Sequence, residues 1–302
     1  MRVLVTGASG FIGSHVCETL RAQGIGVRAL TRSAPARDVD GPAASIEWIV
    51  RDLLHASDRE LSDLGKGVDA CIHAAWCVVP GEYLTSPKND DYRSASLRLF
   101  TALLEQGCGM ITGVGTCFEY EQTDRPLNEA APLGPATPYA EAKLATYRAG
   151  EALARQANAS FAWARLFYLY GPREDSRRLV ASVARCLLRG ERVAVTSGNQ
   201  IRDFLHVADV AAALTSIATS RMNGPVNVGS GQPVRVRDIV RTIGDVIGRS
   251  ELIDYGARPE NAVDPPYVCA DNRRLRTMTA WSPRYGLEEG LRDAITWWRN
   301  RA

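Results

Sequence analysis

The stretch that decides the fold is VLVTGASGFIGSHV, residues 3–16. Residues 3–5 are apolar and predict a short buried strand. Glycines then recur every three residues, and the apolar residues that follow are four apart, as on one face of a helix. A strand, a glycine turn and a helix in this order are typical of a dinucleotide-binding fold, because glycine tolerates positive φ and lets the backbone approach a pyrophosphate.

The start of this helix is the expected phosphate site, since its first N–H groups have no partner within the helix. A tight turn without a ligand is the alternative for a glycine triplet taken alone. The position between a clear strand and a clear helix favours binding. The turn residues expected to contact the cofactor are Gly7, Ser9, Gly10, Phe11, Ile12 and Gly13.

The length of 302 residues suits one large α/β domain with an appended lobe, which we favour over two modest domains. We expect a dinucleotide-binding domain over 1–171 and a substrate-binding lobe over 172–302, with segments near 202–230 returning to the first. The 36 basic and 34 acidic side chains nearly cancel, so nothing indicates nucleic acid or an anionic membrane as a partner.

The seven cysteines are odd in number and lack CxxC spacing, so we expect neither a disulfide framework nor a metal site. A reducing cytoplasm is the expected location. The first strand begins at once, which leaves no room for a signal peptide, and no apolar run approaches the roughly 18 residues that span a bilayer.

The second strand, over 27–30, bears on the choice of cofactor because Arg32 and Ser33 follow it. An acidic residue about 20 positions beyond the glycine turn would bind the ribose hydroxyls of NAD, whereas an arginine suits the 2′-phosphate of NADP. The nearest acids, Asp38 and Asp40, come well after the strand. NADP is therefore favoured over NAD; a solvated arginine in a loop is the alternative.

Further cofactor and substrate residues are expected where strands 46–50 and 70–75 end. Asp52 and Leu53 follow the former, where a carboxylate could bind the adenine amino group or cap the next helix. Ala74 and Ala75 are small enough for a cofactor to lie against them. His73, in the same strand, is expected to be packed or hydrogen-bonded rather than to act as a base. The loop that follows, over 76–87, is rich in aromatic residues, which could line a substrate pocket or simply pack on the surface. The residues expected to line the pocket are Trp76 and Tyr83.

The rest of the chain continues the alternation of strands and helices that is typical of a doubly wound parallel sheet. The expected strands are 110–114 and 161–170, and short strands at 202–206 and 226–229 are expected to return to the sheet. The expected helices are 94–106, 139–154 and 287–298.

Three residues are candidates for catalysis. Thr116 follows strand 110–114, and Tyr139 and Lys143 are four apart and hence on one helix face. Tyrosine titrates near 10 in water, and a nearby ammonium should lower its pKa toward the working pH for general acid/base chemistry. Thr116 would hold the substrate oxygen, and Lys143 would also reach the nicotinamide ribose.

The motifs TGASGFIG, Thr116, YAEAK, RLFYLYGP, RDFLHVADV and NVGSG together resemble the extended short-chain dehydrogenase/reductases, the family of nucleotide-sugar epimerases, dehydratases and 4-ketoreductases. The resemblance implies a Rossmann domain with a smaller C-terminal substrate-binding lobe. It implies that Arg202 and Arg258 bind the diphosphate of a nucleotide sugar and that Phe167 contacts the cofactor. It also implies a homodimer formed through helices 94–106 and 139–154.

Departures from the family pattern bear on the reaction. The dehydratases carry an Asp-Glu pair after the catalytic threonine, where this chain has Cys117 and Phe118, so 4,6-dehydration is disfavoured. Packing is the favoured role for Cys117, and proton donation by its thiol is the alternative. Tyr168 stands where many relatives have asparagine, which leaves that substrate contact open.

We therefore expect an NADPH-dependent reductase acting on the C4 keto group of a nucleotide-activated 4-keto-6-deoxy sugar. The alternative is an NAD-dependent nucleotide-sugar epimerase, which returns its hydride. A non-catalytic dinucleotide sensor is a third possibility, disfavoured because the tyrosine and the lysine are both present.

Overall fold

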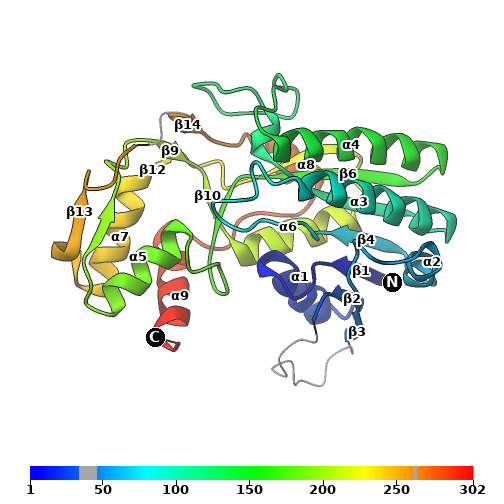
Figure 1. The fold of residues 1–302 in the computed structure, drawn as a ribbon, viewed down its shortest axis with the longest axis horizontal. Coiled ribbons are helices and arrows are strands. Elements are labelled where there is room, and N and C mark those ends of the chain that lie inside the picture. Colours follow the sequence, from blue (N-terminus) through cyan, green and yellow to red (C-terminus); the bar gives the residue numbers. More distant parts are fainter. Residues whose placement is uncertain (34–45, 261–263, 302) are drawn as a thin grey trace.

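The computed structural model describes residues 1–33, 46–260 and 264–301. Its centre is a sheet of seven parallel strands in the order β11-β6-β5-β4-β1-β2-β3 (Figure 1). The predicted fold class, a Rossmann-like doubly wound sheet, is confirmed. The strands of this sheet are β1 (Arg2–Thr6), β2 (Gly26–Thr31), β3 (Ile46–Val50), β4 (Ala70–His73), β5 (Met110–Thr116), β6 (Ser160–Leu166) and β11 (Gly224–Val228).

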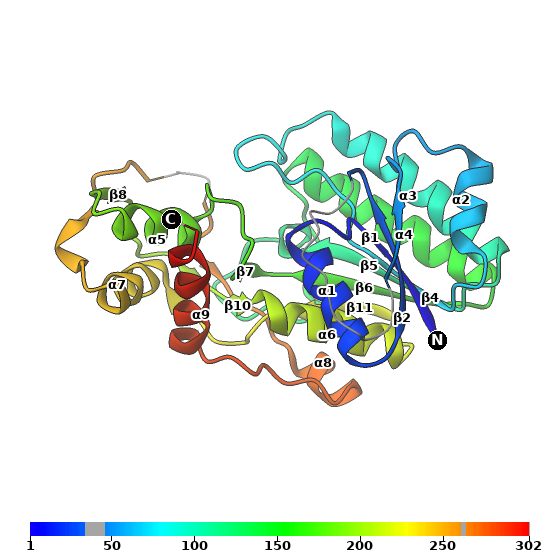
Figure 2. The same ribbon diagram turned by 90° about the horizontal axis from the view of Figure 1, so that it is seen from below.

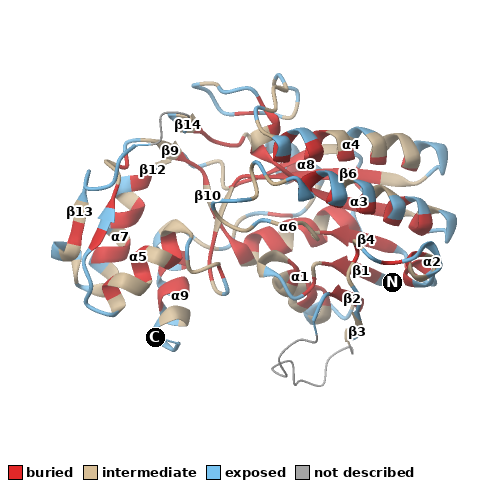
Figure 3. Ribbon diagram, viewed as in Figure 1, coloured by how far each residue is buried: buried red, intermediate tan, exposed pale blue. Residues whose placement is uncertain are grey.

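Helices cover both faces of the sheet, as Figures 1 and 2 show. One face carries α1 and α6, and the other carries α2, α3 and α4. The inner strands and the inward sides of these helices are buried (Figure 3), since a sheet covered on both faces needs apolar residues on both, while the edge strand β3 is partly exposed. The bounds of the helices are α1 (Phe11–Ala22), α2 (Asp58–Gly65), α3 (Lys88–Glu105), α4 (Pro138–Gln156) and α6 (Val207–Thr219).

The register aligns the carboxyl ends of the strands along one edge. Thr6 of β1 pairs with Leu30 of β2 on one side and with His73 of β4 on the other, while Thr116 of β5 pairs with Leu166 of β6. From β1 the strand order runs outward through β2 and β3 on one side, and through β4, β5 and β6 on the other. The direction in which strands are added therefore reverses between β1 and β4. In open α/β sheets the ligand lies at such a point of reversal.

A second group of elements packs around its own apolar core, on the left in Figure 1. Helices α5, α7 and α9 contact one another there, and the parallel strands β8 and β13 border them. Their bounds are α5 (Leu179–Leu188), β8 (Val193–Val195), α7 (Val236–Ile247), β13 (Ile253–Tyr255) and α9 (Leu287–Arg299). The short helix η2 (Ser250–Leu252) contacts α7 in this group, whereas the short helix α8 (Arg273–Met278) contacts β11 of the main sheet.

Two expectations about the strands are wrong. The strand expected over 161–170 is broken at Phe167, whose N–H donates to Val228 O at 3.2 Å, so β6 ends at Leu166 and β7 (Tyr168–Tyr170) starts a separate pairing. The segment 202–206 does not return to the main sheet. It forms β9 (Ile201–Arg202), which pairs with β12 (Val234–Arg235) and β14 (Tyr267–Val268), and β10 (Phe204–His206), which pairs with β7.

The buried carboxylate of Asp203, between β9 and β10, holds this segment in its position outside the main sheet. It accepts hydrogen bonds from the backbone N–H groups of Ser230, Gly231 and Ala270 at 2.6, 2.9 and 3.0 Å. These bonds fasten the turn between β9 and β10 to the loops that follow β11 and β14. Alternating apolar residues cannot reveal this tie, because it is made by one carboxylate with backbone groups far away in the sequence.

The start of one helix also differs from the expectation. Helix α3 begins at Lys88 rather than near residue 94, with Asp90 and Asp91 in its first turn, where acidic side chains stabilise the positive end of the helix dipole. Ser57 is the N-cap of α2: its hydroxyl accepts from Glu60 N, and the Glu60 side chain accepts from Ser57 N in return. Among the described residues, no helix is both long and apolar enough to cross a membrane.

Candidate active site

The glycine turn between β1 and α1 is tightly packed. Gly7 has φ of +67°, and a Cβ there would lie 3.0 Å from the backbone of Ala74 and Ala75, after β4. A Cβ on Gly13 would lie 2.2 Å from Gly7 O. Side chains at either glycine would push the turn away from β4 and α1, so the two glycines allow the close approach predicted from the sequence.

The start of α1 fits a pyrophosphate. Gly10 precedes the helix without a side chain to cap it, and Phe11 and Ile12 begin it with no acidic residue in the first turn. The helix therefore presents uncapped N–H groups and the positive end of its dipole at the carboxyl edge of the sheet. The residues of the turn and of this first helical turn would hold the phosphates of a dinucleotide.

The end of β2 is tied to the turn. Ser9 Oγ and Thr31 Oγ1 are 2.6 Å apart, and Thr31 Oγ1 donates to Ser33 O at 2.9 Å. Arg32, between Thr31 and Ser33, is exposed, and none of the ion pairs among the described residues includes it. Asp38 and Asp40 lie outside the described residues.

Asp52 and Leu53 follow β3 at the same edge. Asp52 Oδ1 accepts from Leu54 N at 3.0 Å, which is a local turn, and Leu53 is buried. The strand ends that precede Arg32 and Asp52 lie side by side, since Thr31 of β2 pairs with Val50 of β3. The structure thus brings Arg32 and Asp52 to the side of the site where the adenosine of a dinucleotide would lie.

The catalytic candidates lie together where β5 ends and α4 begins. Thr116 ends β5, and its Oγ1 accepts from Phe118 N at 3.3 Å at the start of the short helix η1 (Cys117–Glu119). Tyr139 lies in the first turn of α4 and is 7% exposed, and its N–H donates to Leu84 O at 3.1 Å. The Thr116 side chain lies near enough to the Tyr139 phenol to oppose the rise in its pKa.

Lys143 lies one turn further along α4 and is also buried. Its Nζ donates to Val114 O at 2.8 Å and lies 3.8 Å from the centroid of the Trp76 ring and 5.8 Å from that of the Tyr139 ring. Burial lowers the pKa of Lys143 to about 7, and the Glu119 carboxylate opposes that shift. Lys143 is thus poised between its ammonium and amine forms near neutral pH.

The pKa of Tyr139 moves in the direction opposite to the one expected from the sequence. Burial raises it above the ordinary value for tyrosine, and Tyr83 and Glu119 add to the effect. Lys143 does not offset this burial, because its ammonium is directed at Trp76 and Val114 O. The phenol is therefore neutral at physiological pH, the form that can donate a proton.

His73 is a packed histidine, as expected. Its Nδ1 and Thr6 Oγ1 are 2.8 Å apart, its Nε2 and Ser96 Oγ are 2.8 Å apart, and burial lowers its pKa to about 3. Thr6 Oγ1 also accepts from Ala75 N at 3.2 Å. His73 thus fixes the ends of β1 and β4, and it stays neutral at physiological pH.

Aromatic side chains surround the catalytic candidates. Trp76 lies 6.4 Å and Tyr83 4.9 Å from the Tyr139 ring, both edge to face. Phe118 and Tyr168 also meet edge to face, at 6.4 Å between centroids. The predicted substrate residues Trp76, Tyr83 and Tyr168 thus lie around Tyr139 and next to η1.

The two predicted diphosphate arginines differ in their surroundings. Arg202 is 2% exposed, its Nη2 lies 2.6 Å from Asp264 Oδ1, and its guanidinium carbon lies 5.2 Å from the Tyr168 ring centroid. Arg258 is exposed, and its backbone N–H donates to Val195 O at 3.1 Å. No polar contact among the described residues joins Arg258 to Arg202. Phe167, expected at the cofactor, is buried in a cluster with Cys117 and its neighbours.

Comparison with known proteins agrees with this geometry. A model of the NAD dependent epimerase/dehydratase family matches residues 3–229. The chain belongs to this family. It is 31% identical to a UDP-glucose 4-epimerase of Azospirillum brasilense, over 99% of this chain and 92% of that protein.

Solved structures superpose over the whole chain. MoeE5 in complex with UDP-glucose and NAD is 30% identical, with a TM-score of 0.86 over 100% of this chain and 99% of that one. A UDP-N-acetylglucosamine 4-epimerase from Methanobrevibacter ruminantium, in complex with UDP-N-acetylmuramic acid, is 26% identical, with a TM-score of 0.90 over 100% and 99% of the two chains. This chain is therefore an enzyme of the epimerase/dehydratase family.

Two residues that were not predicted from the sequence lie next to the candidate active site. Glu119 caps the backbone of Thr116, a pairing that the spacing T-x-x-E at 116–119 could have indicated. Asp264 pairs with Arg202 across a long stretch of sequence, and no local pattern indicates that pairing.

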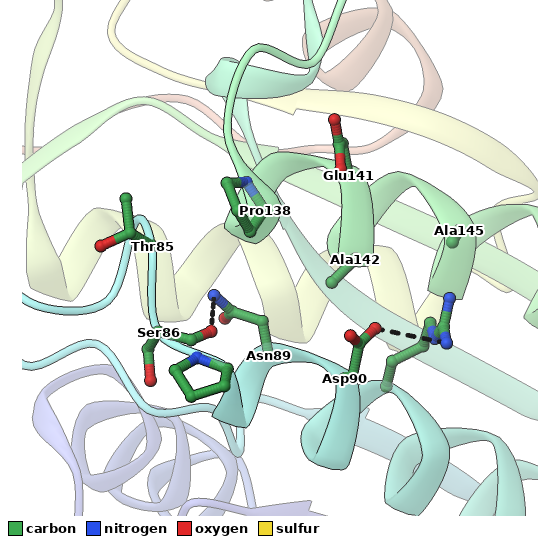
Figure 4. A pocket seen from close by; sticks show the side chains of 10 residues that line it. Thr85, Ser86, Asn89, Asp90, Pro138, Glu141, Ala142 and Ala145 are labelled. Carbon is green, nitrogen blue, oxygen red and sulfur yellow. Dashed lines mark hydrogen bonds and ion pairs between the residues drawn. The ribbon is translucent and has the colours of Figure 1, made fainter.

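A cavity of about 340 Å³ lies between the starts of α3 and α4 (Figure 4). Pro138, Glu141 and Ala142 line it from α4, while Asn89 and Asp90 line it from α3, where Asp90 pairs with Arg93 at 3.3 Å. None of the three catalytic candidates lines this cavity. It lies on the two helices through which a homodimer is predicted, and that assembly stays a prediction.

Proposed function

We propose that the protein is an NADPH-dependent reductase of the C4 keto group of a nucleotide-activated 4-keto-6-deoxy sugar. The observation that carries the proposal is the pair after Thr116. Burial raises the pKa of the Cys117 thiol to about 12, and Phe118 has no proton to exchange. The site therefore lacks the second acid and base that eliminating water from C5 and C6 requires.

The three catalytic candidates suffice for carbonyl reduction. A bound nicotinamide would supply the hydride that adds to C4. Tyr139 then donates its phenolic proton to O4, which its raised pKa permits. Thr116 donates a hydrogen bond to the same oxygen, and the Lys143 ammonium is proposed to bind the nicotinamide ribose and so to position the nicotinamide. The keto group gains one hydride and one proton and becomes a secondary alcohol.

The aromatic contact between Phe118 and Tyr168 supports a 6-deoxy sugar. The two rings lie 6.4 Å apart, and Tyr168 in turn lies 5.7 Å from the ring of Phe204. Since Phe118 is two residues from Thr116, an apolar surface adjoins the expected position of the sugar ring. A C6 methyl group suits such a surface better than a hydroxymethyl group, whose polar atom would lose hydrogen bonds to water.

NADP is the proposed cofactor because Arg32 is exposed at the end of β2, beside the adenosine side of the site. The reaction consumes its hydride, as expected of an enzyme that draws on NADPH. Arg202 is proposed to bind the diphosphate of the nucleotide sugar, since a buried guanidinium forms paired hydrogen bonds to phosphate oxygens.

A second candidate function is NAD-dependent epimerisation of a nucleotide sugar. It is favoured by the 31% identity to a UDP-glucose 4-epimerase and by the NAD bound in the related MoeE5 structure. The same three side chains would then serve a bound nicotinamide that takes a hydride from C4 and returns it to the other face.

A panel of nucleotide sugars, with and without a 4-keto group, incubated with NADPH or NADH tests the proposal by absorbance at the nicotinamide band. We expect NADPH oxidation with a 4-keto-6-deoxy sugar nucleotide. Tyr139→Phe should bind NADPH but lose at least about a hundredfold in kcat. Interconversion of two sugar nucleotides without net NADPH oxidation would establish the epimerase instead.

A further inference from the structure

Glu119 is fully buried directly behind Thr116. Its Oε1 accepts from Thr116 N and from Trp163 Nε1, both at 2.9 Å, and its Oε2 accepts from Arg165 Nε at 2.8 Å. Arg165 is itself 1% exposed and donates to Tyr120 OH at 2.9 Å. Burial raises the pKa of Glu119, whereas Arg165 and these hydrogen bonds favour its carboxylate form and hold it in a single position.

The sequence leaves space for this carboxylate at the end of β5. A Cβ on Gly115 would lie 2.2 Å from Trp163 Nε1 and 2.6 Å from Glu119 Oε1. A Cβ on Gly113 would lie 2.4 Å from the Trp163 ring. The two glycines therefore let the indole of Trp163 lie flat against β5, with its N–H directed at Glu119.

The charged groups around Lys143 are few. On its own helix, Tyr139 is neutral, and on β4 His73 is neutral because burial lowers its pKa to about 3. Trp76 and Val114 O contribute a ring face and one carbonyl. From β6, Trp163 presents its ring 6.0 Å from Lys143 Nζ while its N–H binds Glu119, and Arg165 is already paired with Glu119. Among the described residues, Glu119 is the one whose charge raises the pKa of Lys143.

We propose that Glu119 is a positioning residue of the active site, which fixes Thr116 through its backbone and serves as the buried counter-charge that keeps Lys143 an ammonium. The inference rests on the roles given to Thr116 and Lys143 under the proposed function. Burying a carboxylate costs free energy. A role at two catalytic candidates would account for a buried carboxylate here better than the packing of β5 against β6 alone.

The chain makes the test direct because its only lysines are Lys66, Lys88 and Lys143. In protein labelled with ¹³C at lysine Cε, three resonances are expected, and Lys143→Arg assigns one of them. Titration of that resonance in the Glu119→Gln variant should show the pKa of Lys143 lowered by about one unit from the wild-type value, since removing a nearby opposite charge disfavours the ammonium. An unchanged titration in a folded variant would overturn the proposal.

Two further variants separate the charge from the packing. Glu119→Gln leaves Arg165 buried without its partner, so the double variant Glu119→Gln/Arg165→Met provides a neutral pair if the single variant fails to fold. Its Lys143 titration should show the same lowering. Asp209→Asn is the matched control, because Asp209 is also a buried carboxylate, accepts from Arg284 N and Tyr285 N at 2.9 and 3.1 Å, and lies on α6. It should leave the Lys143 titration unchanged.

The alkaline limb of the pH profile of kcat gives a second readout. Losing Glu119 should move this limb to lower pH by a similar amount, because less ammonium remains at a given pH. A uniformly lower kcat with an unmoved limb would show that Glu119 only supports the fold and would contradict the proposal. The titration needs no substrate, so failure of the proposed reduction appears separately, as a wild-type enzyme that titrates as expected but does not oxidise NADPH.

Discussion

The ammonium of Lys143 lies 3.8 Å from the centroid of the Trp76 ring and 2.8 Å from Val114 O. The indole is held in place by a hydrogen bond from its Nε1 to Asn89 Oδ1 at 2.9 Å and by stacking on Tyr92. Trp76 thus covers the lysine that we propose reaches the nicotinamide ribose. The ring stabilises the ammonium against the cost of burial through a cation–π contact.

Replacing Trp76 should therefore shift the pH dependence of the reaction. Trp76→Leu removes the ring face, so the pKa of Lys143 should fall below about 7. Activity that needs the ammonium is present at low pH and is lost as pH rises through that pKa, so the alkaline limb of kcat should move down by about 0.5–1 pH unit. Trp76→Phe retains an aromatic face and should move the limb less. Identical limbs in all three proteins would contradict the contact's role.

The choice between NADPH and NADH should depend on Arg32. Arg32→Ala removes the guanidinium expected at the 2′-phosphate, so KM for NADPH should rise about tenfold or more while KM for NADH changes little. Arg51→Ala is the matched control, since Arg51 is exposed just after β3 but pairs with Glu60 at 2.9 Å. Equal changes for the two cofactors, measured by steady-state kinetics, would exclude a phosphate role.

Binding of the nucleotide sugar should depend on Arg202. Because its Nη2 pairs with Asp264 at 2.6 Å, a diphosphate must compete with that carboxylate. Arg202→Gln should raise KM for the sugar nucleotide at least about tenfold with a smaller effect on kcat, whereas Asp264→Asn should lower KM. A higher KM in Asp264→Asn would show that the pair assists binding rather than competing with it.

Stability should fall with rising pH because of Glu174. Burial raises its pKa to about 8, from an ordinary value of 4.5, and its Oε2 has no hydrogen-bond partner among the described residues. The folded state binds this proton more tightly than the unfolded state, so the stabilisation is complete below about pH 4.5 and is lost as pH rises toward 8. Glu174→Gln should raise Tm relative to wild type at pH 8 but not at pH 5. Glu105→Gln, at an exposed position on α3, should leave Tm unchanged at both values.

The Rossmann-like core could be predicted from sequence because its signals are local. The glycine turn and the apolar strands carry their own patterns, and β1 and β5 form where they were expected. The segments near the junction could not be predicted, since the bonds of Asp203 and the break at Phe167 depend on partners far away in the chain. The polar start of α3 likewise shows no apolar periodicity.

Within the site, residue types could be predicted better than their electrostatics. Spacing alone placed Tyr139 and Lys143 on one face of α4, and the structure adds Thr116 next to Tyr139. The direction of the Tyr139 pKa depends on burial, which a sequence does not show. The contribution of Glu119 depends on Trp163 and Arg165, which lie on a neighbouring strand.

Transfer of deuterium is the most direct test of the central claim, that the site delivers a hydride to the C4 carbonyl of a 4-keto-6-deoxy sugar nucleotide. The enzyme is incubated with NADPH carrying deuterium at the transferable position of the nicotinamide, and the sugar product is analysed by NMR and mass spectrometry. The account predicts one deuterium at C4 for each NADPH oxidised, and none with Tyr139→Phe. A product that forms without deuterium, and without loss of NADPH, would contradict it.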